Sequence, residues 1–299
     1  MPWYSLLILV MLVLMGLFIG QAAGVLVAIV STGYRISQLP ELISEPFTND
    51  KRIPIYLLQG FGTLGGFIAA GMVYLRYLER VSPISFFRKN TNAGILLASV
   101  IMVISFMFAN TWFIDWNANI TFPHALKGFE TWARGKEDAM KDITDFLTRF
   151  TSLKDFIIGF VVVAILPAFA EEFLFRGIIQ NRMEIILKNG HTAVWLTAIL
   201  FSAFHFQFFG FLPRMMLGVL FGYMYYWSRN LWFPVLAHFL NNGFTLVMIY
   251  LFHLGVVPTN IEEEKALPVA TILAFAFVGF VLLIYFRQYF LRKTPAMHE

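Results

Sequence analysis

The chain has 299 residues, of which 59% are hydrophobic and only 13% are charged, and its formal net charge is +4. A soluble domain typically has about 25% charged residues, so this composition excludes an ordinary soluble protein and indicates a membrane protein. The sequence contains no cysteine, which excludes disulfides and thiolate metal sites, and it has no basic patch or motif typical of nucleic-acid binding.

Long uncharged stretches predict an all-α, polytopic membrane protein with about eight transmembrane helices. About 20 apolar residues cross the hydrocarbon core of a bilayer. The stretches without Asp, Glu, Lys or Arg that are long enough are 1–34, 53–75, 90–114, 189–213, 230–261 and 266–286. Shorter apolar stretches at 156–170 and 215–228 continue into weakly charged flanks and supply two further spans. The first stretch is too long for the apolar region of a signal peptide, and no basic segment precedes it, so we expect it to be the first helix.

The first half of the chain is predicted to be a scaffold of membrane helices. Gly62 and Gly66 lie four residues apart in the second span, a spacing that allows two helices to approach closely. The charged segment 115–155 ends in the amphipathic stretch "KDITDFLTRFTSLKDF", which predicts either a helix at the membrane interface or a solvated connector.

Orientation is predicted from the basic residues of the short loops, because Lys and Arg are enriched on the cytoplasmic side. With both termini in the cytoplasm, one side of the membrane holds Arg76, Arg80, Arg88, Lys89, Arg182, Lys188, Arg229, Arg287, Arg292 and Lys293. The acidic segment 260–265 then lies on the opposite side. We therefore expect a multi-pass protein of the plasma membrane with both termini cytoplasmic.

The fourth span carries three ionisable residues within the apolar run "AILPAFAEEFLFRGIIQ" (164–180). Ionisable groups at this depth cost several kcal/mol each unless they have a partner or face a polar cavity. Glu172 and Arg176 are four residues apart, so they share a helix face and are predicted to form a structural ion pair. Glu171 is rotated by about 100° from Glu172 and has no obvious helical partner. Glu171 is then the carboxylate available for chemistry.

Two further spans carry polar residues at a spacing of four. "FSAFHF" places His205 four residues after Phe201, and "HFLNN" places His238 four residues before Asn242. Either pair alone is compatible with a hydrogen bond that only joins helices. The predicted spans put His205 near the outer end of the fifth helix and His238 near the inner end of the seventh. Tilted or unequal helices are needed for the two histidines to meet in one cavity.

Together the three patterns resemble the CPBP family of intramembrane proteases, which includes the type II CaaX prenyl endopeptidases and the bacterial Abi proteins. The family pattern EExxxR, FxxxH, HxxxN is matched over roughly residues 155–250 by Glu171-Glu172-x-x-x-Arg176, Phe201-x-x-x-His205 and His238-x-x-x-Asn242. The resemblance implies a division of the chain into N-terminal scaffold helices and a connecting loop (1–150), a CPBP catalytic core (151–255), and a C-terminal helix with a basic tail (256–299).

The resemblance implies hydrolysis of peptide bonds in membrane-associated peptides or proteins, within the lipid bilayer. Glu171 and His205 would activate a water molecule, and His238 and Asn242 would donate hydrogen bonds to the developing oxyanion. A zinc-dependent version with Glu171, His205 and His238 as ligands is the alternative. The sequence has no HExxH helix and its histidines are on different helices, which favours the metal-free reaction.

Two functions of other classes remain open at this point. Deep glutamate and histidine residues also mark proton-coupled transporters, but such proteins have matching halves with broken helices, and here the unusual residues all lie in one half. The second alternative to a protease is an immunity or scaffold protein that retains the fold without activity. The sequence names no particular substrate.

Overall fold

The computed structural model describes residues 2–42, 47–88, 92–150, 152–258 and 267–293. Lys89 and the acidic segment 260–265, both used above to predict orientation, lie outside these residues. The described part is helical and contains no strand, which confirms the all-α class. Six helices are long and apolar enough to cross a membrane: Trp3–Thr32, Asn49–Glu79, Ala93–Ala118, Leu153–Leu187, Trp232–His253 and Val269–Arg292. The chain is therefore a polytopic membrane protein.

The predicted number of eight spans stays a prediction. The fifth and sixth predicted spans correspond to α10 (Gly190–Ala203), which is apolar but short, and α11 (Phe211–Ser228). Neither is among the six long apolar helices of the described chain. α11 packs against α10 and against α5 (Ala93–Ala118), α12 (Trp232–His253) and α13 (Val269–Lys293). In contrast, α10 packs on α11 with one face and leaves an apolar face exposed at Trp195, Leu196, Ile199 and Leu200.

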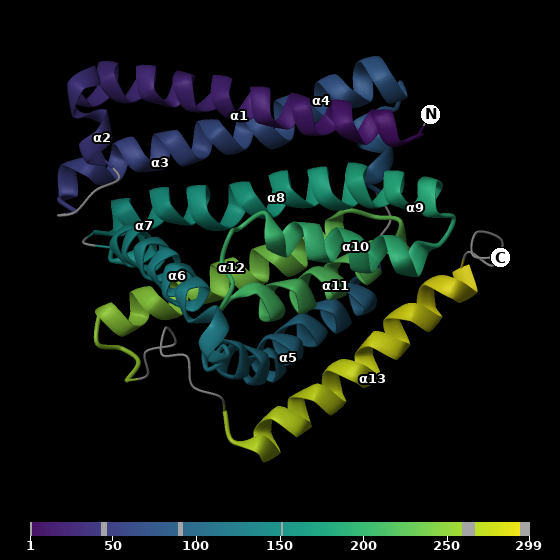
Figure 1. The fold of residues 1–299 in the computed structure, drawn as a ribbon. Coiled ribbons are helices and arrows are strands. Elements are labelled where there is room, and N and C mark those ends of the chain that lie inside the picture. Colours follow the sequence, from purple (N-terminus) through teal and green to yellow (C-terminus); the bar gives the residue numbers. More distant parts are fainter. Residues whose placement is uncertain (1, 43–46, 89–91, 151, 259–266, 294–299) are drawn as a thin grey trace.

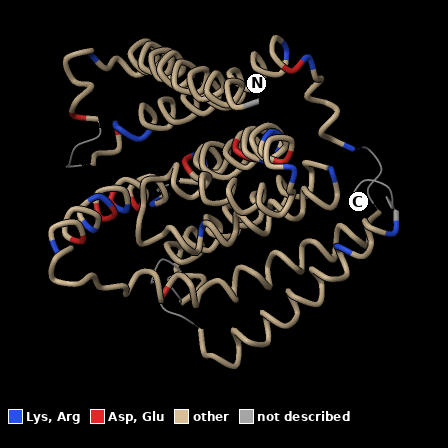
Figure 2. Tube along the Cα trace, turned by 45° about the vertical axis from the view of Figure 1, so that its right-hand side comes forward, with Lys and Arg blue, Asp and Glu red and all other residues tan. Residues whose placement is uncertain are grey.

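The helices form three layers (Figure 1). One outer layer holds α1 (Pro2–Thr32) against the broken second span, which consists of α3 (Asn49–Thr63), the π-helical turns η2 (Leu64–Ala69) and η3 (Leu75–Glu79), and α4 (Ala70–Tyr74) between them. The other outer layer pairs α5 (Ala93–Ala118) with α13 (Val269–Lys293). Charged residues gather at the helix ends and along α6 (Lys127–Thr148), while most of each long helix carries none (Figure 2).

The middle layer carries the motif residues. It is made of α10, α11, α12 (Trp232–His253) and one continuous helix comprising α7 (Leu153–Gly159), η6 (Phe160–Ile165), α8 (Leu166–Glu172), η7 (Phe173–Gln180) and α9 (Asn181–Leu187). η6 and η7 are π-helical, and such turns often occur at functional sites. The remaining short elements are η1 (Ile36–Gln38), α2 (Leu39–Leu42), η4 (Pro83–Phe86) and η5 (His124–Leu126).

Small residues allow the first two spans to touch along their backbones. A Cβ atom added at Gly16 of α1 would lie 2.3 Å from the Gly65 carbonyl oxygen, which is closer than such atoms pack. Gly66 faces Leu17 of the same helix, where an added Cβ would lie 2.5 Å from side-chain atoms, and Gly62 faces Gln21 at 3.4 Å. The predicted close helix contact at Gly62 and Gly66 is therefore present, and α1 is its partner.

Candidate active site

The centre of the middle layer holds a buried ion pair. Arg176 Nη1 donates to Glu172 Oε1 at 2.9 Å, and both side chains are 0% exposed. Arg176 Nη2 also donates to the Gly218 carbonyl at 3.0 Å, and its guanidinium lies 4.5 Å from the centre of the Phe201 ring. These contacts compensate much of the cost of burying the charge, as the sequence predicted for this pair.

Glu172 has a second partner that the sequence did not reveal. His238 Nδ1 lies 2.8 Å from the same Oε1 atom. Because Glu172 is ion-paired and accepts from Nδ1, the hydrogen is placed on Nδ1 and Nε2 is the ring nitrogen left for other contacts. His238 also stacks on Phe221, with ring centres 5.5 Å apart. Glu172 therefore joins α8 to α12 and orients His238, the histidine of the HxxxN pattern.

Glu171 differs from its neighbour in having no hydrogen-bond partner for either carboxylate oxygen among the described residues. The Oε2 atoms of both glutamates are inaccessible to solvent and unpaired, but Glu172 Oε1 is held by Arg176 and His238. A buried polar atom without a partner costs about 1 to 3 kcal/mol, so it is rarely kept without a reason. The helical rotation between neighbouring residues, which turns Glu171 away from Arg176, explains why one carboxylate is paired and the other is not.

His205 lies just beyond the end of α10, in the turn that follows Ala203. Its Nδ1 atom is 2.9 Å from the Phe201 carbonyl oxygen. The Phe201 ring contacts both imidazoles, with centres 5.2 Å from His205 and 5.9 Å from His238. The two histidines thus meet at one ring, although the predicted spans placed them at different depths.

Asn242 lies one turn further along α12 than His238. Its Nδ2 atom donates to the Val163 carbonyl at 3.3 Å, and its Oδ1 atom accepts from Asn241 Nδ2 at 3.1 Å. Asn242 therefore faces the helix that carries the glutamates, at η6, and its amide is held by two neighbours.

Arg214 is a residue of this region whose position the sequence did not predict. It lies at the start of α11, where Nη2 donates to Gln207 Oε1 at 2.6 Å and Nη1 is inaccessible and unpaired among the described residues. Glu171 and Glu137 lie within electrostatic range of its guanidinium. Glu137 comes from α6 and accepts from the Phe209 backbone N–H at 3.2 Å, so α6 covers the loop that carries His205.

The residues of the zinc alternative were tested for a donor cluster. Among the described residues no three His, Cys, Asp or Glu side chains are grouped closely enough to hold a metal ion. Glu171, His205 and His238 therefore do not form such a group in the described structure.

The chain was compared with known proteins. Residues 153–244 match the family model described as type II CAAX prenyl endopeptidase Rce1-like. The uncharacterized protein YpbD of Bacillus subtilis (strain 168) is 34% identical over 84 residues, which are 27% of this chain and 40% of YpbD. The membrane-embedded CAAX protease MroQ of Staphylococcus aureus (strain USA300) is 29% identical over 90 residues, which are 28% of this chain and 36% of MroQ. No solved structure gives a significant match.

The family match covers the segment that holds Glu171, Glu172, Arg176, His205, His238 and Asn242. The chain spans well under half the length of the two curated relatives. The matched segment and the three motifs within it support a CPBP-family core in this chain, similar to the type II CAAX prenyl endopeptidases.

Proposed function

We propose that the protein is an intramembrane endopeptidase that hydrolyses peptide bonds of membrane-associated peptides or proteins. The observation that carries the proposal is the pair of unlike glutamates on one helix. Glu172 Oε1 is bound by Arg176 and His238, whereas Glu171 has no hydrogen-bond partner among the described residues. The matched family and the protease MroQ support hydrolysis of peptide bonds as the reaction class.

In the proposed reaction Glu171 is the general base. Its free oxygen accepts a proton from a water molecule that His205 helps to hold, and the water oxygen attacks the scissile carbonyl carbon. The resulting oxyanion receives a hydrogen bond from Asn242. His238, whose Nδ1–H is donated to Glu172, adds a second hydrogen bond from Nε2 in its doubly protonated form. When the tetrahedral intermediate collapses, the C–N bond breaks and Glu171 returns the proton to the leaving amine. The products are a carboxylic acid and an amine, so all atoms are accounted for without a metal ion.

The proposed roles of His238 and Asn242 are supported by how they are held. Glu172 and Phe221 restrain the His238 ring, and the Val163 carbonyl and Asn241 restrain the Asn242 amide. Donors that are already oriented stabilise charge in the transition state without the cost of reorganisation, an effect often worth about 3 kcal/mol.

Two isosteric substitutions on neighbouring residues test the proposal. Glu171→Gln is expected to abolish cleavage and to leave thermal stability unchanged, because it removes the base but no hydrogen bond seen in the described structure. Glu172→Gln is expected to lower stability by about 3 to 5 kcal/mol, because it leaves the buried Arg176 charge uncompensated. The measurements are thermal unfolding in detergent and proteomic comparison of membranes from cells that express each form.

Uncut membrane peptides should accumulate with Glu171→Gln and not with the wild type. A normal cleavage rate for Glu171→Gln would refute the role of this residue. Treatment of the wild-type protein with a strong chelator should leave cleavage intact, and activity that is lost and then restored only by zinc would support the metal-dependent alternative.

A further inference from the structure

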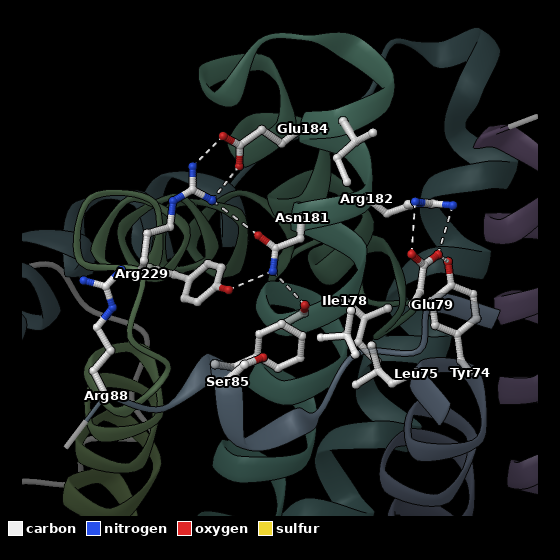
Figure 3. A pocket seen from close by; sticks show the side chains of 15 residues that line it. Tyr74, Leu75, Glu79, Ser85, Arg88, Ile178, Asn181, Arg182, Glu184 and Arg229 are labelled. Carbon is white, nitrogen blue, oxygen red and sulfur yellow. Dashed lines mark hydrogen bonds and ion pairs between the residues drawn. The ribbon is translucent and has the colours of Figure 1, made fainter. Parts of the chain in front are cut away.

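A cavity lies outside the candidate active site. It encloses about 540 Å³, a volume within the usual range for small-ligand sites, and is lined by residues of η3, η4, η7, α9 and the end of α11 (Figure 3). Asn181, which lines it, follows Glu171 by ten residues on one continuous helix. At 1.5 Å per residue the two are about 15 Å apart along the helix axis, so this cavity is separate from the paired glutamates.

The cavity lies where three helices end. η3 ends at Glu79, α9 ends at Leu187 and α11 ends at Ser228. Membrane helices end near the headgroup region of the bilayer, so the opening lies at that depth. The apolar part of the wall includes Leu75 and Ile178. A cavity that joins apolar walls to this depth suits an amphiphile.

The charged groups of the wall are mostly neutralised by one another. Arg182 pairs with Glu79 at 2.9 Å, and Arg229 Nη1 donates to Glu184 at 2.7 Å. Arg88 is different, because no hydrogen bond or ion pair joins its guanidinium to any other described residue. Its backbone is nevertheless held in place by Asn230, which accepts from the Arg88 N–H at 3.1 Å and donates to the Arg88 carbonyl at 3.4 Å. The cavity therefore has one positioned and uncompensated cation.

A neutral donor accompanies this cation. The Tyr225 hydroxyl oxygen accepts from Asn181 Nδ2 at 2.7 Å, so the orientation of the phenol is fixed. The hydroxyl hydrogen has no acceptor within the described part of the chain. Tyr225 and Arg88 both line the cavity, and Figure 3 shows Arg88 and Arg229 on the same side of it. Guanidinium and hydroxyl donors together recognise a phosphate group.

We propose that this cavity binds the headgroup of an anionic phospholipid. The phosphate is held by Arg88 and Tyr225, and an acyl chain follows the apolar wall along Leu75 and Ile178. A single net positive charge matches one phosphodiester. The apolar wall and the depth of the opening favour a lipid over a free phosphate ion. This binding is independent of the proposed peptidase reaction.

A charge-matched pair of variants tests the lipid site. Arg88→Gln is expected to weaken binding of phosphatidylglycerol by on the order of 10-fold, because it removes charge-assisted hydrogen bonds. Arg76→Gln, an equally exposed arginine of η3 that does not line the cavity, should bind as the wild type does. Binding is measured by native mass spectrometry of the whole chain in neutral detergent during titration with phosphatidylglycerol, with phosphatidylcholine as the zwitterionic comparison.

Competition with inorganic phosphate distinguishes a site for a lipid headgroup from a site for a free phosphate ion. The proposal expects phosphate to compete poorly with phosphatidylglycerol, and Ile185→Gln, at the apolar edge of the cavity, to weaken lipid binding. Equal binding by Arg88→Gln and the wild type, or equal losses with Arg88→Gln and Arg76→Gln, would overturn the site. Competition by phosphate at the affinity of the lipid would overturn the assignment of a lipid.

Discussion

Glu172 Oε1 contacts both Arg176 and His238, and this one oxygen joins two of the three motifs of the family. At the residue scale the difference between Glu171 and Glu172 therefore lies in their partners. Glu172 orients His238 through its Nδ1 atom, whereas Glu171 is free to interact with water or substrate in the site. Phe201 and Phe221 complete the arrangement, since both rings contact Arg176 and His238.

Asn242→Ala tests the oxyanion role at the same scale. The proposed hydrogen bond forms only when charge develops on the substrate oxygen, so its loss should affect the chemical step rather than binding. We expect kcat to fall by on the order of 10²-fold with little change in KM, measured on a cleaved membrane peptide. A variant with full kcat and a raised KM would instead make Asn242 a residue that positions the substrate.

At the scale of elements, glycines determine how closely helices approach. Arg176 and Gln180 of η7 donate to the Gly218 and Gly222 carbonyls of α11, each at 3.0 Å. Both glycines also face α10, where added Cβ atoms would lie 3.2 Å from Ala198 and 2.9 Å from Val194. The spacing of four on both helices gives two parallel contacts, one turn apart, and these hold the ion pair in its position.

The contact of α1 with the second span provides a prediction about stability. Gly16→Ala should destabilise the protein by about 1 to 3 kcal/mol, because its Cβ would overlap the Gly65 carbonyl and force the helices apart. Gly135→Ala is the matched control, since an added Cβ there meets nothing within 4 Å in α6 and improves helix propensity. Thermal unfolding in detergent compares the two. Equal melting temperatures for both variants would contradict the close contact.

The start of α6 provides a prediction about pH. Glu130 accepts from Lys127 at 3.0 Å, from the Phe122 N–H at 3.2 Å and from Arg134 at 3.1 Å. These bonds, that from Lys127 first, lower the pKa of Glu130 from 4.5 to about 2. A lowered folded-state pKa adds stability above the unfolded value, and this stability is lost as the pH falls from about 4.5 to about 2.

Glu130→Gln isolates this contribution. Wild-type and variant melting temperatures are measured across the same acidic range. The wild type should be more stable near neutral pH, and the difference should shrink as the pH falls through that window. A difference that does not change with pH would show that the Glu130 carboxylate makes no net ionic contribution.

At the scale of the whole molecule, both described ends of the chain lie on one side. The start of α1 and the end of α13 lie at the same end of the bundle as α9 (Figure 1). Arg88, Arg182 and Arg229, from three different loops or helix ends predicted to share a side, line one cavity. The clustering of these cations supports the predicted cytoplasmic assignment of this end, which stays a prediction.

Two matched residues test the orientation. Ile36 and Ile84 are each 73% exposed, in η1 and η4 at opposite ends of the second span, and the chain has no native cysteine to interfere. A membrane-impermeant maleimide applied to intact cells should label Ile36→Cys and not Ile84→Cys. Permeabilised cells should allow labelling of both. The reverse pattern in intact cells would place the termini outside the cytoplasm.

The sequence by itself determined the class of the protein and the residues to examine. Uncharged stretches of about 20 residues are constrained by the bilayer alone, so the long helices could be recognised without tertiary contacts. A spacing of four is a property of one helix, so the Glu172–Arg176 pair could be predicted locally. The three motifs, which lie on different spans, identified the family through their order along the chain.

Only the tertiary structure decided which motif residues touch. The bond from His238 to Glu172 joins residues 66 positions apart, and no helical spacing encodes it. The contact of the Phe201 ring with His238 likewise joins α10 to α12. The position of the loop 204–210 depends on its contact with Glu137 of α6. Arg214 of α11 is also held by that loop, through the bond to Gln207. Each of these contacts arises where separate helices pack, because a helix sets the direction of its own side chains but not what lies opposite them.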